Sequence, residues 1–218
     1  MIDFHGVSKS FPVRGGRRHV LRDFTMAFPP NRNMALIGRN GAGKSTLLGM
    51  IAGNLAPDRG RIVRHGRVSW PMGFAGGMHP QLTGRQNARF LARVCGVETA
   101  EAEEAVAAFA EIGAFFDMPV ETYSAGMRAR LALGMSLSVR FDCYLVDEMT
   151  EVGDAAFKLK CRAAVRDHLK DALVIVAAHS EVTLKDLCDC ALVLDGGRAW
   201  YFDTVDEGLR AYRSLLAA

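Results

Sequence analysis

The first candidate for chemistry is a glycine-rich stretch that ends in a lysine and a serine. Residues 38–45 read Gly-Arg-Asn-Gly-Ala-Gly-Lys-Ser, which fits the pattern G-x-x-x-x-G-K-[ST] at every fixed position. Glycines let backbone N–H groups turn toward an anion, the lysine adds a positive charge for the outer phosphates, and the serine hydroxyl can bind Mg²⁺. The residues expected to hold a nucleoside triphosphate are Gly38, Arg39, Asn40, Gly41, Ala42, Gly43, Lys44, Ser45 and Thr46.

Two acidic residues, further along the chain, are the second candidate. Residues 143–146 are an apolar run that leads directly into Asp147 and Glu148. A buried parallel strand delivers the residues at its carboxyl end to a ligand crevice. We therefore expect Asp147 to orient Mg²⁺ through water, and Glu148 to polarise the attacking water as a general base.

A histidine follows the next apolar run. Residues 173–178 predict a buried strand that ends at His179. A lone histidine at a strand end is often structural. Because the neighbouring strand is expected to end at Asp147, however, His179 would face the same crevice. We favour a role for it in contacting the γ-phosphate or holding the geometry of the water.

The elements that must position these residues alternate between strands and helices. Residues 34–37 predict a short buried strand before the glycine-rich loop, and residues 46–52 predict a helix after it, whose N-terminus favours phosphate. A glycine-rich turn that arose by chance would need neither a strand before it nor a helix after it. The fold class predicted is α/β, a P-loop NTPase with a mixed β-sheet core, a small antiparallel β subdomain and a helical insert. The insert covers approximately residues 85–140 of a single domain spanning 1–218.

Within the insert, Leu91, Val94 and Cys95 are expected to share one helical face, and the acidic run from Glu98 is expected to open a second helix. Residues 71–84 are rich in glycine and predict a flexible loop. Residues 58–60 predict a turn. Residues 14–18 carry three arginines and predict a solvated hairpin tip, with contact to acidic lipid head groups as the alternative.

Composition narrows the class of protein. The chain has 218 residues and a formal net charge of +3, which is too small to argue for a nucleic-acid partner. Its five cysteines form no C-x-x-C pair, which favours a reducing, cytosolic compartment. The N-terminus has no apolar core typical of a signal peptide. The longest apolar run, residues 172–178, is far below the ~18 residues of a membrane span.

Together these motifs resemble an ATP-binding cassette (ABC) ATPase over nearly the whole chain. The order matches: phosphate loop, helical insert, a signature at residues 123–127, the two acids, and a switch histidine. The resemblance implies that Ser124, Ala125 and Gly126 hold the γ-phosphate of an ATP on a partner cassette, so that a head-to-tail homodimer carries two ATPs at composite sites. It also implies that Asp154 is the aspartate of the D-loop. Phe11 matches the aromatic side chain that stacks on adenine, with His19 in reserve.

The sequence departs from the family in two places. The usual signature is Leu-Ser-Gly-Gly-Gln, but residues 123–127 read Tyr-Ser-Ala-Gly-Met. The serine and the second glycine are kept, so the helix N-terminus can still hold a phosphate. The family's glutamine at the mouth of the insert has no clear counterpart. His79 and Gln81 are the polar candidates, and neither is assigned.

Within the family, the chain resembles the ATPases of capsular polysaccharide export systems of Gram-negative bacteria, through residues 35–48, 69–71, 76–77, 82–84, 123–131 and 148–157. Related O-antigen exporters often carry a further C-terminal domain, and a chain ending at Ala218 favours the capsule type. The resemblance implies ATP and Mg²⁺ as cofactors and an integral membrane permease as partner. It further implies peripheral association with the cytoplasmic face of the inner membrane, indirect handling of the polysaccharide and no nucleic acid.

Two alternatives stay open, namely a non-transport cassette ATPase acting on nucleic acid or the ribosome, and an ABC ATPase for another substrate. In this family a short helix of the membrane partner docks near residues 70–85. The sequence places Trp70, Met72, Phe74 and Met78 there. We expect them either to meet that helix or to pack into the insert's own core.

Overall fold

The computed structural model describes residues 2–72, 77–147, 157, 160, 164, 169, 170, 172–178 and 180–217. The chain divides into two compact units. The first comprises Met1–Pro71, Phe141–Glu148 and Ala172–Ala218, and the second Met72–Arg140 and Met149–Asp171. Each unit has its own apolar core and is described by itself.

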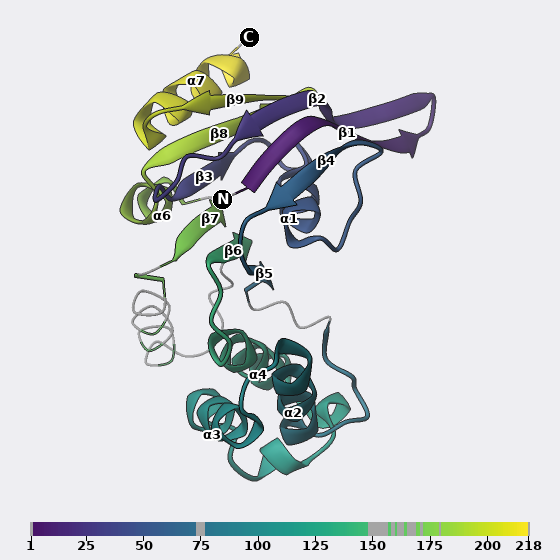
Figure 1. The fold of residues 1–218 in the computed structure, drawn as a ribbon, viewed down its shortest axis with the longest axis vertical. Coiled ribbons are helices and arrows are strands. Elements are labelled where there is room, and N and C mark those ends of the chain that lie inside the picture. Colours follow the sequence, from purple (N-terminus) through teal and green to yellow (C-terminus); the bar gives the residue numbers. More distant parts are fainter. Residues whose placement is uncertain are drawn as a thin grey trace. The chain divides into compact units, whose positions relative to one another are not determined.

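A mixed sheet is the centre of the first unit (Figure 1). Its strand order is β5-β6-β7-β3-β8-β9. All neighbours run parallel except β8 and β9, which are antiparallel. The strands are β5 (Val68–Pro71), β6 (Cys143–Asp147), β7 (Leu173–Ala177), β3 (Met34–Ile37), β8 (Cys190–Asp195) and β9 (Arg198–Phe202). The four inner strands β6, β7, β3 and β8 are largely apolar because both of their faces are covered. The mixed-sheet core is thus confirmed.

A second, antiparallel sheet has the order β2-β1-β4. Its strands are β1 (Ile2–Val13), β2 (Gly16–Ala27) and β4 (Arg59–Arg64). The predicted small antiparallel subdomain is therefore present, but its hairpin is longer than the short strands that alternation suggested. Only residues 14 and 15 make the turn, and Arg17 and Arg18 already lie in β2. The turn expected at 58–60 is wrong, because β4 begins at Arg59 and pairs with β1.

The core of the first unit lies around helix α1 (Lys44–Ala52). Four of its side chains are buried, on more than one side of the helix: Leu47, Leu48, Met50 and Ile51. They pack with buried side chains of both sheets in one apolar cluster. Arg64 of β4 donates from Nε to the carbonyl of Ile51 and from Nη2 to that of Met50, each at 2.6 Å. These bonds help to satisfy carbonyls at the end of α1, where the Met50 carbonyl also accepts from the Gly53 amide at 3.2 Å.

Two further helices complete the described part of the first unit. Helix α6 (Glu181–Leu187) is capped by Ser180, whose Oγ accepts from the Thr183 amide. Helix α7 (Val205–Ala217) buries Val205, Gly208 and Leu209 and lies along β8 and β9 (Figure 1). Gly208 is needed for this packing, since a Cβ atom there would stand 2.5 Å from that of Ala191 in β8. The helix predicted for the last residues is confirmed.

The second unit is helical where the structure describes it. Its elements are α2 (Gly84–Cys95), α3 (Thr99–Ala110), two short 3₁₀ turns (Gly113–Asp117 and Val120–Thr122) and α4 (Ala125–Leu137). Thr83 and Gln86 form a capping box at the start of α2, and Glu98 caps α3 as its acidic run predicted. Val94 is 67% exposed, whereas Leu91 packs against the apolar cluster of the helical unit. The face turned inward carries Ala88 and Ala92.

Two of the four large apolar residues between 70 and 78 pack within their own units. Trp70 lies edge-on to Phe141 with ring centroids 5.2 Å apart. Met78 packs against the apolar cluster of the helical unit. These contacts favour internal packing for the two side chains, and Met72 is buried, with 7% of its surface exposed. Phe74 lies outside the described residues. Within the described part of the chain, no helix is long and apolar enough to cross a membrane.

Candidate nucleotide site

The carboxyl ends of three parallel strands lie level with one another in the first unit. Asp147, the last residue of β6, is paired with Ala177 of β7, and Ala177 is paired with Leu36 of β3. The glycine-rich loop follows β3 directly, at the edge of the sheet where parallel α/β folds bind their ligands. The strand-end placement predicted for Asp147 is therefore confirmed by the register.

The phosphate loop runs from β3 to α1 and depends on glycine at two positions. Gly41 and Gly43 have φ of 77° and 110°, a backbone region that side chains disfavour. The Ala42 amide donates to the Arg39 carbonyl at 3.0 Å, which closes a tight turn inside the loop. Gly43 is the N-cap of α1, so the loop opens directly onto the positive end of that helix.

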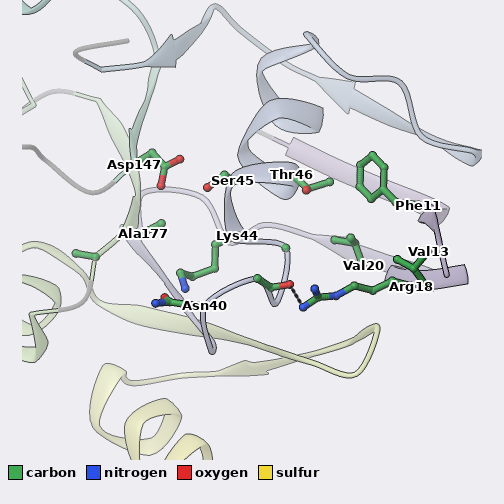
Figure 2. Close-up of a pocket in the computed structure, with 13 residues that line it drawn as sticks. Phe11, Val13, Arg18, Val20, Asn40, Lys44, Ser45, Thr46, Asp147 and Ala177 are labelled. Carbon is green, nitrogen blue, oxygen red and sulfur yellow. Dashed lines mark hydrogen bonds between the residues drawn. The ribbon is translucent and has the colours of Figure 1, made fainter.

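Lys44 lies against its own loop. Its Nζ donates to the carbonyl of Gly38 at 2.7 Å and to that of Arg39 at 3.3 Å. The ammonium is thus held beside the loop, and its side chain lines the adjoining cavity (Figure 2). A lysine in this place can meet the outer phosphates of a nucleotide seated on α1.

The cavity beside the loop has a volume of about 550 Å³. Its walls come from the hairpin, the loop and the two neighbouring strand ends: Phe11, Val13, Arg18, Val20, Asn40, Gly41, Gly43, Lys44, Ser45, Thr46, Asp147, Ala177 and Ala178. A cavity of this size is typical of small-molecule sites. Of the expected phosphate-binding residues, Gly38, Arg39 and Ala42 do not line it, although the latter two line an adjacent hollow of about 390 Å³.

Ser45 and Asp147 supply oxygen donors on the same side of the cavity (Figure 2). Hydroxyl and carboxylate oxygens are the ligands that Mg²⁺ prefers, and Mg²⁺ is commonly held by one or two protein groups together with substrate phosphates and water. Among the described residues, no cluster of three or more His, Cys, Asp or Glu side chains could hold a metal by itself. The donors fit a Mg²⁺ ion that arrives with a nucleotide.

The far wall of the cavity is formed by the hairpin β1–β2. Phe11 is 39% exposed and lines the cavity, as an aromatic wall for a base requires. The ammonium of Lys9 lies 5.5 Å from the centre of its ring. His19, the reserve candidate, lines the adjacent hollow instead. The two candidates therefore line different hollows, and stacking of adenine on Phe11 stays a prediction.

The signature residues belong to the second unit. Ser124 caps α4, where its Oγ accepts from the Met127 amide at 3.2 Å. Ser124 and Ala125 are exposed. The neighbouring Tyr123 is buried, and its hydroxyl donates to the Phe115 carbonyl at 2.6 Å and accepts from the Gly84 amide at 3.2 Å. Burial raises the pKa of Tyr123, so the phenol stays protonated and anchors the segment that leads into the cap.

Gly126 has open space around it. A Cβ atom there would meet only the Ser124 hydroxyl, at 3.8 Å, which is ordinary contact distance. Packing within the described chain therefore does not explain a glycine in the first turn of α4, where alanine would be about 1 kcal/mol more favourable. Glu148, Asp154 and His179 lie outside the described residues.

Arg18 is a site residue that sequence reasoning missed. Its Nη2 donates to the Gly41 carbonyl, and its side chain lines the cavity (Figure 2). The sequence predicts a solvated hairpin tip for residues 14–18, with contact to lipid head groups as the alternative. Alternation along a strand places Arg17 and Arg18 on opposite faces, but it does not say which face meets the loop.

Comparison with known proteins agrees with this geometry. The family profile described as "ABC transporter" matches residues 21–151. The polysialic acid transport ATP-binding protein KpsT of Escherichia coli is 44% identical over 98% of this chain and 96% of its own. The capsule polysaccharide export ATP-binding protein CtrD of Neisseria meningitidis is 40% identical over 99% of this chain and 100% of its own.

Solved structures show the same fold. The ATP-binding cassette MJ0796, described as a dimer in a post-hydrolysis state with ADP and Pi, superposes with a TM-score of 0.77 at 16% identity, over 94% of this chain and 99% of that one. The ATP-binding subunit of another ABC transporter gives 0.75 at 21% identity, over 100% and 95%. These agreements confirm the predicted fold class and the resemblance that the motifs indicated. The chain belongs to the ABC transporter family.

Proposed function

We propose that this protein is the ATP-hydrolysing subunit of an ABC exporter that moves a capsular or related cell-surface polysaccharide across the inner membrane. The observation that carries the proposal is the meeting of the phosphate loop and Asp147 in one cavity at the carboxyl edge of the parallel sheet. The substrate class follows from the relatives, whose names describe polysialic acid transport and capsule polysaccharide export.

In this proposal, one cassette binds ATP with its own residues. Phe11 stacks on the adenine, residues 38–46 wrap the phosphates, and Lys44 exchanges its loop carbonyls for the outer phosphates. Ser45 and Asp147 would hold Mg²⁺, which would neutralise part of the phosphate charge. Glu148 polarises the attacking water as a general base, and His179 holds the γ-phosphate and that water in line.

The second half of each site comes from another copy of the chain. Ser124, Ala125 and Gly126, at the N-terminus of α4, bind the γ-phosphate of the partner's ATP, and Asp154 is the aspartate of the D-loop. The exposed Ser124 and the unexplained glycine at 126 support this, because a phosphate needs close approach to the helix N-terminus. Approximately residues 85–140 form the helical subdomain that presents this surface.

An integral membrane permease carries the polymer, and this chain handles it only indirectly. The protein then acts at the cytoplasmic face of the inner membrane as a peripheral subunit. ATP-driven closure of the homodimer would be transmitted to the permease. Neither nucleic acid nor the ribosome is a partner in this proposal.

The experiment is a paired measurement on Lys44→Ala. The purified variant should lose Mg²⁺-dependent phosphate release, because no positive charge offsets the outer phosphates. Expressed in cells that lack the native copy, it should fail to restore polymer on the cell surface. A folded Lys44→Ala protein that hydrolyses ATP at the wild-type rate would overturn the phosphate-loop assignment. Wild-type ATPase activity without any effect of the gene on surface polymer would overturn the transport assignment alone.

A further inference from the structure

The hairpin β1–β2 presents both an aromatic ring and a positively charged side chain to the phosphate loop. Phe11 and Arg18 are directly paired across the hairpin. Side chains of directly opposed residues project from the same face of a sheet. Both side chains line the cavity (Figure 2). Arg17 is engaged elsewhere, with its Nε donating to Ser10 Oγ at 2.9 Å and its Nη2 lying 3.5 Å from the Asp58 carboxylate.

The Arg18 side chain reaches the tip of the loop and packs closely against Gly41. Its Nη2 donates to the Gly41 carbonyl. A Cβ atom at Gly41 would stand 2.8 Å from that same nitrogen and 3.3 Å from Nη1, so a side chain at 41 would displace the guanidinium. The positive φ of Gly41 and the contact with Arg18 therefore both favour glycine at this position.

The position of Arg18 complements that of Lys44. Lys44 Nζ lies at the start of the loop, on the carbonyls of Gly38 and Arg39. Arg18 comes to the loop from the hairpin wall that carries Phe11, which is the base end of the cavity (Figure 2). A guanidinium has five N–H donors in a rigid fork, so the bond to Gly41 leaves it able to bind a phosphate oxygen as well.

We propose that Arg18 is a second phosphate-binding cation of this site, which holds the tip of the loop and contacts the phosphate next to the ribose. That phosphate is the one that a base stacked on Phe11 brings closest to the hairpin. The inference rests on the proposed nucleotide-binding function and adds to it a residue that acts equally on ATP and ADP, since both carry this phosphate.

The test compares Arg18→Met, Arg18→Lys and Arg17→Met by titration with Mg-ATP and Mg-ADP. Arg18→Met should raise the Kd of both nucleotides by the same factor, about ten- to hundredfold, because one charge-assisted contact is lost. Arg18→Lys should recover part of the affinity, and Arg17→Met should bind as wild type does.

The salt dependence of the Kd distinguishes a direct phosphate contact from a purely structural role of Arg18 in holding the loop. Loss of a direct charge contact should make the Kd of Arg18→Met less sensitive to added salt than that of wild type. The proposal is overturned by an unchanged Kd, by a loss confined to ATP, or by a loss with an unaltered salt dependence. A wild-type protein that binds no Mg-nucleotide would overturn the proposed function itself. If the wild-type protein binds Mg-nucleotide and Arg18→Met binds it equally well, only this inference is overturned.

Discussion

The side chain of Val20 occupies the space that a Cβ atom at Gly43 would need. Val20 is 4% exposed and lies at an irregular step in the register of β1 and β2, between His19, which is paired with Ser10, and the buried Leu21, which is paired with Lys9. One extra residue in a strand breaks the alternation of faces in this way. The irregularity in the hairpin therefore packs the branched side chain of Val20 against Gly43, the N-cap of α1. A strand that is distant in sequence thus helps to determine the conformation of the phosphate loop.

Gly43→Ala should consequently destabilise the protein and weaken nucleotide binding. Alanine at φ 110° is strained by about 1–3 kcal/mol, and its methyl group would also overlap Val20. Adding Val20→Ala should remove the overlap but not the backbone strain. Urea unfolding of the two single variants and the double variant should therefore give a favourable coupling of about 0.5–3 kcal/mol. Strictly additive free energies would show that the two residues do not compete for this space.

The sequence alone could predict the loop, the level strand ends and the mixed sheet, because each depends on a local apolar run or on a glycine pattern. It could not predict that Val20 and Arg18 shape the loop. That outcome depends on the register of two long strands and on where their pairing slips. A single sequence does not encode such a slip in any local pattern.

Other differences have similar causes. Asp58 was expected in a turn because of its neighbours Arg59 and Gly60, but pairing with β1 draws both neighbours into a strand. Val94 has the helical spacing of a buried residue. The small residues Ala88 and Ala92 nevertheless face the core of the helical unit. Periodicity identifies an apolar face, and tertiary packing decides which of two such faces is used.

Asp58 should make part of the protein's stability depend on pH. The Lys9 ammonium at 3.0 Å, followed by the Ser10 amide and hydroxyl, lowers the pKa of Asp58 from 3.8 to about 2. A carboxyl whose pKa is lower in the folded state stabilises the protein above its unfolded pKa and loses that effect as pH falls through the folded value. The contribution is thus complete above about pH 4 and disappears toward pH 2.

Asp58→Asn tests this directly. The variant should melt at a lower temperature than wild type at neutral pH, and the difference should shrink as pH falls from about 4 to about 2. In a Lys9→Met background, Asp58→Asn should lower Tm by less than it does in wild type, because the two groups form one interaction. The double variant should therefore be little less stable than either single variant. A difference in Tm that is constant across this range would contradict the assignment.

Asp147→Asn should act on the metal requirement rather than on the fold. Asp147 lines the cavity with Ser45, so loss of its charge should raise the Mg²⁺ concentration needed for half-maximal ATPase activity. Affinity for nucleotide measured without Mg²⁺ should change little. Asp142→Asn is the matched control, because Asp142 precedes the same strand and accepts from the Arg67 amide at 2.7 Å, at the opposite end of β6. An unaltered Mg²⁺ titration in Asp147→Asn would remove Asp147 from the metal site.

A composite site can be tested by mixing two inactive proteins. If each site takes Lys44 from one chain and Ser124 from its partner, Lys44→Ala and Ser124→Ala homodimers have no intact site. A heterodimer of the two, however, has one site with both residues intact. Equal mixing should restore about a quarter of the wild-type activity, since about half of the dimers are mixed and each has one working site of two. A chain carrying both substitutions, mixed with Ser124→Ala, forms no intact site and is the negative control.

Ser124 also caps α4, so a loss of stability must be separated from a loss of phosphate binding. Thr83→Ala removes the corresponding side-chain cap from α2 in the same helical unit, and each substitution should cost about 1 kcal/mol of stability. Thr83→Ala should therefore lower Tm by a similar amount but keep its ATPase activity. If Thr83→Ala is as inactive as Ser124→Ala, or if mixing restores nothing although mixed dimers form, the two residues do not meet across an interface. The signature at residues 123–127 would then serve only to begin and cap helix α4.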